Sequence, residues 1–265
     1  MSSDAGSGAV ATTRARPKAL SGATYVRYEV LRTFRNVRFF IFSLVFPVVL
    51  YIVTVSSNKD VTNFAGTGLS FALYYMVGMV SWGAMMAVTA GGARIALERS
   101  IGWVRQLRLT PLKVQTYFTT KVLSGYGLAL VSMALLYGLG IAFGVRLPMA
   151  SWARMTLLIL IGLIPFAALG VWFGHVLSVD SLGPALGGIV ALFALLGGAW
   201  GPVAGNSQFM TNLAELLPSY WLVQAAHSAF TGEWWPLKGW VVIAVWTIVL
   251  VRLSQRAYRR DTMRV

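Results

Sequence analysis

Long runs of residues without Asp, Glu, Lys or Arg divide the chain into apolar segments. A helix needs about 20 residues to cross the roughly 30 Å hydrocarbon core of a bilayer. The pattern predicts six transmembrane helices, at about residues 39–57, 69–91, 122–145, 155–178, 182–200 and 234–253. The sixth contains only 13 consecutive charge-free residues, 239–251, so Lys238 and Arg252 are expected to extend toward the two interfaces.

Basic side chains fall unevenly among the segments that join these spans. With the N-terminus in the cytoplasm, 18 Lys and Arg residues lie in inner segments and 4 in outer ones, namely Lys59, Arg146, Arg154 and Lys238. Inner loops of membrane proteins carry an excess of Lys and Arg. Both termini are therefore expected to be cytoplasmic.

The composition supports an all-α integral membrane protein. Hydrophobic residues make up 57% of the 265, charged residues only 11%, and the mean hydropathy is +0.69, whereas soluble proteins carry about a quarter charged residues. The net charge of +14 is explained by topology, so nucleic-acid binding is not expected. The absence of Cys excludes disulfides and thiolate zinc sites, and two His residues make a metal centre improbable.

The first 38 residues are predicted to lie outside the bilayer. Residues 1–20 are mostly small and polar and are expected to form a disordered tail. Residues 21–38 have one apolar face and are expected to form an amphipathic helix in the inner interface, with polar residues Arg27, Glu29, Arg32 and Arg35. A lipid anchor and a contact with a cytoplasmic partner both remain open for this helix. At the other end, residues 254–265 are expected to form a basic cytoplasmic tail.

The inner loop between the second and third spans, residues 93–112, has the pattern of a bent helical elbow. Gly102 offers a break between two short helical pieces. Thr110 followed by Pro111 then has the pattern of an N-cap and first helical residue, which would restart a helix into the third span. Because both ends of this elbow join membrane helices, force applied to it would reach both spans.

This elbow also resembles a known family. Glu98-Arg99, Gly102, Leu107 and Thr110-Pro111, placed between the second and third of six spans, are similar to the cytoplasmic signature of the type-2 ATP-binding-cassette (ABC) exporter permeases. That signature often contains Glu-Arg-Glu, Gly-Thr, a further Glu, Leu and Thr-Pro. This chain departs from it at Ser100, Trp103 and Arg105. The resemblance extends over nearly the whole chain through the order of its segments.

The resemblance implies that the elbow is a coupling helix that docks on a separate ATPase subunit. Trp103 and Leu107 would be apolar anchors, and Arg99, Arg105 and Arg108 would donate charge-assisted hydrogen bonds. The implied coupling residues are Glu98, Arg99, Gly102, Trp103, Arg105, Leu107, Arg108, Thr110 and Pro111. The chain contains no Gly-x-x-x-x-Gly-Lys-Ser/Thr motif. No cofactor is therefore expected on this chain, and ATP and Mg would bind to the partner.

The function so implied is that of the permease subunit of a bacterial exporter in the inner membrane. It would move a drug-like or lipid-like amphipathic solute outward, with two ATPase subunits and a second permease copy or close relative. No catalytic or metal-binding residues are expected in the chain. The competing interpretation is a membrane anchor or scaffold that binds a cytoplasmic protein through its basic loop and transports nothing.

Apolar and aromatic residues of the first two spans are candidates for the substrate path. Pro47 is expected to kink the first span. Aromatic and Met side chains suit a surface that accepts varied amphipathic molecules, and the candidates are Phe42, Phe46, Met79, Trp82 and Met86. Core packing is an equally good interpretation of each.

Three smaller features complete the expectations. His175 is interpreted as a packing residue, with a proton relay or substrate contact as the alternative. Asp180 is expected to cap the fifth span. Residues 202–236 are expected to form an outer re-entrant segment, with Trp234 and Trp235 at headgroup level.

Overall fold

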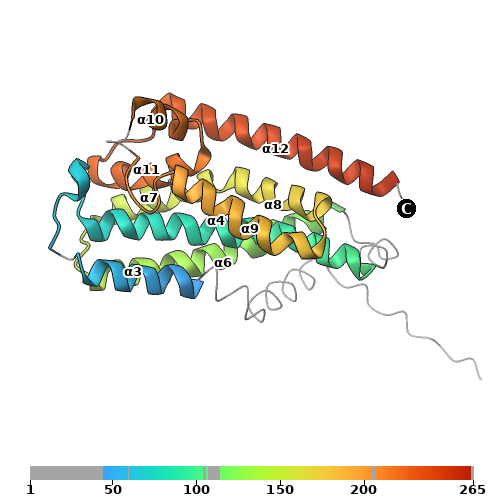
Figure 1. Ribbon diagram of the computed structural model, residues 1–265, viewed down its shortest axis with the longest axis horizontal. Coiled ribbons are helices and arrows are strands. Elements are labelled where there is room, and N and C mark those ends of the chain that lie inside the picture. Colours follow the sequence, from blue (N-terminus) through green and yellow to red (C-terminus); the bar gives the residue numbers. More distant parts are fainter. Residues whose placement is uncertain (1–43, 59, 104–105, 107–113, 204–206, 264–265) are drawn as a thin grey trace, which may run out of the picture.

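The protein is a bundle of helices aligned along a common direction (Figure 1). The computed structural model describes residues 44–58, 60–103, 106, 114–203 and 207–263, and within these residues there is no β-strand. In this described part of the chain, five helices are long and apolar enough to cross a membrane, and a shorter apolar helix, Phe46–Ser56, lies in the first predicted span. Residues 39–43 of that span lie outside the described residues. The chain is therefore a multi-pass, all-helical membrane protein.

The helix α4, Phe71–Ser100, forms the centre of the bundle. Apolar or small residues occupy all sides of its membrane segment, which is 94% buried by its neighbours. Around it pack α3 (Phe46–Ser56), α6 (Val114–Ala142), α8 (Ile164–Val176), α9 (Val179–Leu196) and α11 (Pro218–Thr231). The remaining elements are the 3-10 turn η2 (Phe64–Gly66), α7 (Met149–Gly162), α10 (Gln208–Glu215) and α12 (Leu237–Met263).

The second and third membrane helices are longer than the hydropathy pattern predicts, at the ends that join the expected elbow. α4 continues nine residues past Gly91, and α6 begins at Val114 instead of residue 122. The first half of the expected elbow is thus the end of α4 and not a separate short helix. Charged residues continue the helix here because their side chains find partners on neighbouring helices, as described below.

Two prolines mark helix breaks at places that differ from the expected one. Pro47 lies in the first turn of α3, where a missing N–H is tolerated, after two π-helical residues at 44–45. The fourth membrane helix is instead divided at Leu163 into α7 and α8, with Pro165 in the first turn of α8. The Tyr126 hydroxyl donates to the carbonyl of Leu160 at this break, 3.0 Å away.

The segment before α12 folds into two helices. α10 carries many polar residues, whereas α11 is buried against α7 and α4 through side chains such as Trp221 and Leu222. Trp234 is 52% exposed and suits a headgroup position. Trp235 differs from the expectation, since it is 4% exposed and packs between the rings of Trp221 and Trp240.

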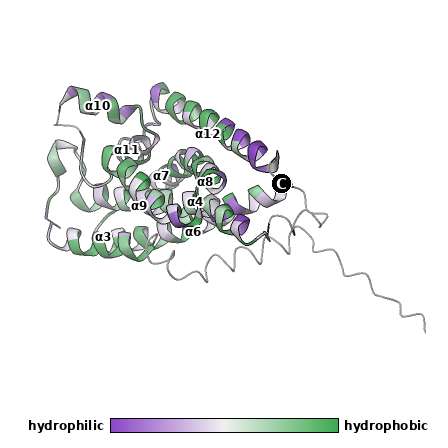
Figure 2. Ribbon diagram, turned by 45° about the vertical axis from the view of Figure 1, so that its right-hand side comes forward, coloured by the Kyte–Doolittle hydropathy of each residue, from purple (hydrophilic) through white to green (hydrophobic). Residues whose placement is uncertain are grey.

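Two expectations near the helix ends are corrected. Ser178, not Asp180, caps α9, because its hydroxyl accepts a hydrogen bond from the N–H of Ser181, and Asp180 lies in the first turn. Residues 254–263 are not a tail but the last part of α12, where hydrophilic residues gather (Figure 2). The helix continues because Ser254 and Asp261 pack against α8 and α4.

Candidate functional site

The candidate site is the last turn of α4, at the end of the bundle where α6 begins and α8 and α12 finish. α4 ends at Ser100, and the N–H of Gly102 donates to the carbonyl of Arg99 at 3.1 Å. Gly102 has a φ of 72°, a left-handed conformation that glycine adopts without a steric penalty. The break in the helix thus lies where the glycine is placed in the sequence.

Glu98 is buried inside the bundle and joins α4 to α6. Its side chain is 2% exposed and forms an ion pair with Lys121, which is 1% exposed. The hydroxyl of Tyr117, one turn earlier on α6, donates to the other carboxylate oxygen at 2.6 Å. A charge buried this deeply is stable only when it is paired and hydrogen-bonded. Glu98 therefore joins α4 to α6 and positions the two helices.

Arg99 joins α4 to two further helices. One guanidinium nitrogen donates to the carbonyls of Gly174 and His175, at 3.0 and 2.8 Å, where α8 ends. The other two nitrogens lie 2.7 Å from the two carboxylate oxygens of Asp261 on α12. A cation at a helix C-terminus satisfies carbonyls that have no partner within the helix. Arg99 thus uses its donors inside the bundle, and its expected contact with an ATPase stays a prediction.

His175 lies beside this cluster and has mainly packing contacts. Its Nδ1 is 3.3 Å from Asp261, and its ring packs edge-on against Phe118 and Tyr258. The three rings fill the space between α6, α8 and α12. This geometry favours the packing interpretation of His175 over a proton relay.

The opposite face of the same helical turn is apolar and exposed. Leu97 is 39% exposed and Ile101 is 60% exposed, and a spacing of four residues places them on one side of α4. Sequence reasoning missed Ile101 because its neighbours Arg99 and Gly102 carried the resemblance. The signal was present, since an apolar pair at this spacing lies on the side of the helix opposite Arg99.

Several expected site residues are not among the described ones. The elbow residues Arg105, Leu107, Arg108, Thr110 and Pro111 lie outside the described part of the chain, as do the interfacial-helix residues Arg27, Glu29, Arg32 and Arg35, and Phe42 of the substrate path. Trp103 is described and half-buried, and its indole nitrogen is buried without a hydrogen-bond partner among the described residues.

The remaining substrate-path candidates lie in and beside the core. Met79 is fully buried in α4, and Trp82 and Met86 are 7% and 8% exposed. Phe46 is 43% exposed and packs edge-on against Trp82, which in turn contacts Trp200 after α9. The structure therefore brings together an aromatic row between α3, α4 and the end of α9, whereas Met79 packs in the interior.

The charged side chains at the end of α4 are suited to transmitting a displacement between helices. Within the described residues, no group of three or more His, Asp and Glu could hold a metal ion. The charged groups instead join four helices through one turn: Glu98 to α6, and Arg99 to α8 and α12. A displacement of the end of α4 would reach all of them.

Replacing Asp261 by Asn is expected to lower the free energy of unfolding by about 1–2 kcal/mol, because Arg99 loses a bidentate carboxylate while keeping its carbonyl contacts. Unfolding in mixed SDS and detergent micelles measures this. Asp180→Asn is the matched control, since Asp180 is exposed in the first turn of α9, and it is expected to change stability by less than about 0.5 kcal/mol. Equal effects of the two variants would contradict the role assigned to Asp261.

Comparison with known proteins agrees with this architecture. The family model described as ABC-2 family transporter protein matches residues 54–254. A relative in Bacillus subtilis (strain 168), named "Putative transport permease YvfS", is 26% identical over 239 residues, which cover 88% of this chain and 95% of the relative. The matched region includes the whole of α4 and its contacts with α6 and α8. The chain therefore belongs to the ABC-2 family of transporter proteins and is a membrane-spanning transport subunit of the permease type.

Proposed function

We propose that this chain is the permease subunit of an ABC exporter and that the end of α4 receives the force of ATP hydrolysis. ATP and Mg would bind to a separate ABC ATPase subunit. The observation that supports this most is the division of one helical turn into two faces. Glu98 and Arg99 join α6, α8 and α12, while Leu97 and Ile101 are exposed next to the turn at Gly102.

These two faces would couple the nucleotide state of the ATPase to the positions of the membrane helices. An ATPase surface that binds Leu97 and Ile101 would pull or rotate the end of α4 when its nucleotide state changes. The buried pair with Lys121 and the contacts with Asp261 would transmit that displacement to α6 and α12. Coupling free energy passes between sites through elements that have two arrangements, and a rigid joint among four helices is suited to this.

The exported solute would be amphipathic or hydrophobic, and the chain would act with a second copy or a close relative. Only 11% of the membrane segment of α9 is buried, and Leu192 and Leu195 are each 54% exposed. On α3, Val53 is 61% exposed. These apolar faces are available for lipid and for another permease chain. The excess of Lys and Arg supports a bacterial inner membrane with both termini and the α4 end in the cytoplasm.

Two measurements separate an exporter from a passive scaffold. The chain has no Cys, so single Cys residues can be placed at Ile101 and Phe46 as accessibility probes. Co-purification of an ABC ATPase, together with a change in labelling rate of Phe46→Cys when nucleotide is added, is expected of an exporter. A protein that retains no ATPase, and whose labelling rate does not change when nucleotide is added, would be a scaffold.

Replacing Ile101 by Glu is expected to reduce ATPase co-purification and transport at least about tenfold, because a carboxylate would be desolvated in an apolar contact. Ser100→Glu is the matched control, since Ser100 is also exposed and lies on the adjacent side of the turn. The control should bind the ATPase normally. Normal transport by the Ile101→Glu variant, inserted at the normal level, would exclude this face as the docking site.

A further inference from the structure

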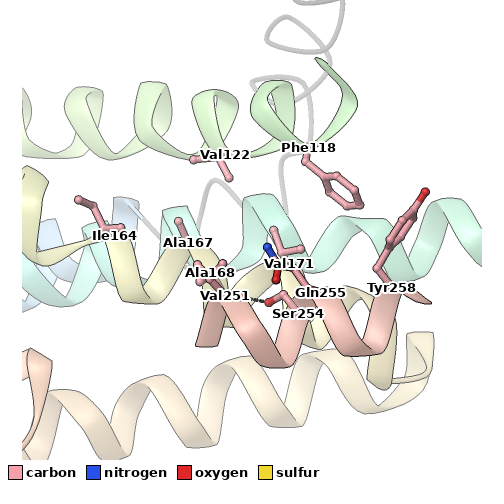
Figure 3. A pocket seen from close by; sticks show the side chains of 10 residues that line it. All are labelled: Phe118, Val122, Ile164, Ala167, Ala168, Val171, Val251, Ser254, Gln255 and Tyr258. Carbon is pink, nitrogen blue, oxygen red and sulfur yellow. Dashed lines mark hydrogen bonds between the residues drawn. The ribbon is translucent and has the colours of Figure 1, made fainter. Parts of the chain in front are cut away.

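A cavity of about 320 Å³ lies between α6, α8 and α12, near the end of the bundle that carries the Arg99 cluster (Figure 3). Phe118 and Val122 line it from α6, Ile164 and small residues from α8, and Val251 and Tyr258 from α12. The hydroxyl of Ser254 also faces this region but is satisfied by backbone carbonyls, with Ala168 at 2.9 Å. The cavity is therefore apolar, and its size is at the lower end of ligand-binding pockets.

The cavity is elongated along the helices and opens sideways. Val251 and Tyr258 are seven residues apart on α12, which corresponds to about 10 Å along the helix axis. The rings of Phe118 and Tyr258, with centroids 5.3 Å apart, close the end nearest Asp261. Ile164 and Val251 at the other end are 43% and 38% exposed. The opening at that end is thus lined by exposed apolar side chains, next to the part of α12 that the hydropathy pattern places in the hydrocarbon region.

Positive charge lies along the side of α12 that lines the cavity, with Arg252 next to Val251 and Arg259 next to Tyr258. Arg252 and Arg259 lie three residues before and four residues after Gln255, a lining residue, and so share its side of α12. Both are exposed, and neither forms an ion pair with any described residue. Arg146 and Arg154, which lie toward the other end of the bundle, instead donate to the carbonyls of Ile141 and Ser228.

We propose that this cavity binds one acyl chain of an anionic phospholipid, whose phosphate is held by Arg252 and Arg259. An apolar slot that runs along the bilayer normal accepts the chain, and each buried methylene contributes about 0.8 kcal/mol. Unpaired guanidinium groups at its edge select a phosphate that carries net negative charge. The bound chain would fill the gap between α6 and α12. This site goes beyond the transport function and does not depend on it.

The test uses the full-length protein reconstituted in bilayers of equal parts phosphatidylcholine and phosphatidylglycerol, then extracted in mild detergent for native mass spectrometry. We expect retained phosphatidylglycerol to exceed phosphatidylcholine about tenfold or more, since two Arg residues near the surface contribute about 1 kcal/mol each. Photo-crosslinking with phosphatidylglycerol that carries a diazirine in its acyl chain should modify both residues 117–123 and residues 251–258. Equal retention of the two lipids, or crosslinks confined to other segments, would overturn the proposal.

Variants test the two halves of the site separately. Val122→Trp should fill the cavity and abolish lipid retention, whereas Leu123→Trp, at an exposed neighbour outside the lining, should not. If Val122→Trp does not fold, Ile164→Trp at the opening replaces it. Arg252→Gln combined with Arg259→Gln should remove the preference for phosphatidylglycerol.

The matched control for the charge variant is Arg260→Gln. Arg260 is exposed on the opposite side of α12 from Val251, so its loss should leave the preference unchanged. Lipid retention by a folded, cavity-filled variant at the level of the unchanged protein would exclude this cavity. An equal loss of preference on removing Arg260 would exclude a specific role for Arg252 and Arg259.

Discussion

Replacing Lys121 by Leu is expected to destabilise the protein by about 3–5 kcal/mol, because the carboxylate of Glu98 loses its ammonium partner in a position that is 2% exposed. Desolvation of a buried carboxylate that has lost its ammonium partner costs more than the new apolar contacts of Leu can offset. Unfolding in mixed SDS and detergent micelles measures the change in free energy. The temperature at which the monodisperse peak in size-exclusion chromatography is lost should also fall.

A second ion pair in the chain provides the control. Lys238 and Glu215 are also separated by 23 residues, but their side chains are 49% and 26% exposed. Lys238→Leu should therefore cost no more than about 1 kcal/mol. The double variant Glu98→Leu with Lys121→Leu should recover much of the stability lost by Lys121→Leu alone, since it removes both charges. A double variant that is less stable than the single one by a further 3 kcal/mol would contradict the pairing.

The apolar elements of this fold could be read from the sequence, whereas the partners of its charges could not. The positions of the long spans follow from charge-free runs, which is a local property. The central place of α4 follows from its small and apolar residues on every side. Arg99, however, binds groups that lie 75 to 162 residues away in sequence. No local pattern shows which distant helix ends beside it.

The count of charges along the chain gave Lys121 and Arg99 a role in topology alone, although each also has a structural role. Lys121 and Arg99 contribute to the inner excess of positive charge, and each is also a structural partner within the bundle. The motif that resembles the ABC exporter permeases directed attention to Glu98 and Arg99, and the structure places both side chains in contact with neighbouring helices. These contacts could not be predicted from the motif, because a short motif records residue types and not the face of the helix on which each lies. Ile101, at the exposed face, had no place in that motif.

The close approach of α4 and α8 is expected to be the part of the bundle least tolerant of added volume. A Cβ on Gly170 would lie 2.0 Å from the carbonyl oxygen of Thr89, and one on Gly92 would lie 2.5 Å from the backbone nitrogen of Val171. Backbone atoms on both sides cannot move aside as a flexible side chain can. The two helices therefore depend on glycine for their present separation.

Replacing Gly170 by Ala is accordingly expected to cost about 3 kcal/mol or more, at the upper end of the range for overpacked cores, because α8 must move away from α4 as a whole. The same displacement would pull the carbonyls of Gly174 and His175 away from Arg99, so transport should fall together with stability. Gly187→Ala on α9 is the matched control. A Cβ there meets nothing within 4 Å, so this variant should be as stable as the original or up to about 1 kcal/mol more stable. Unfolding free energies measured in the same micelles compare the two directly, and equal stability of the two Ala variants would show that α4 and α8 do not approach each other at Thr89 and Gly170.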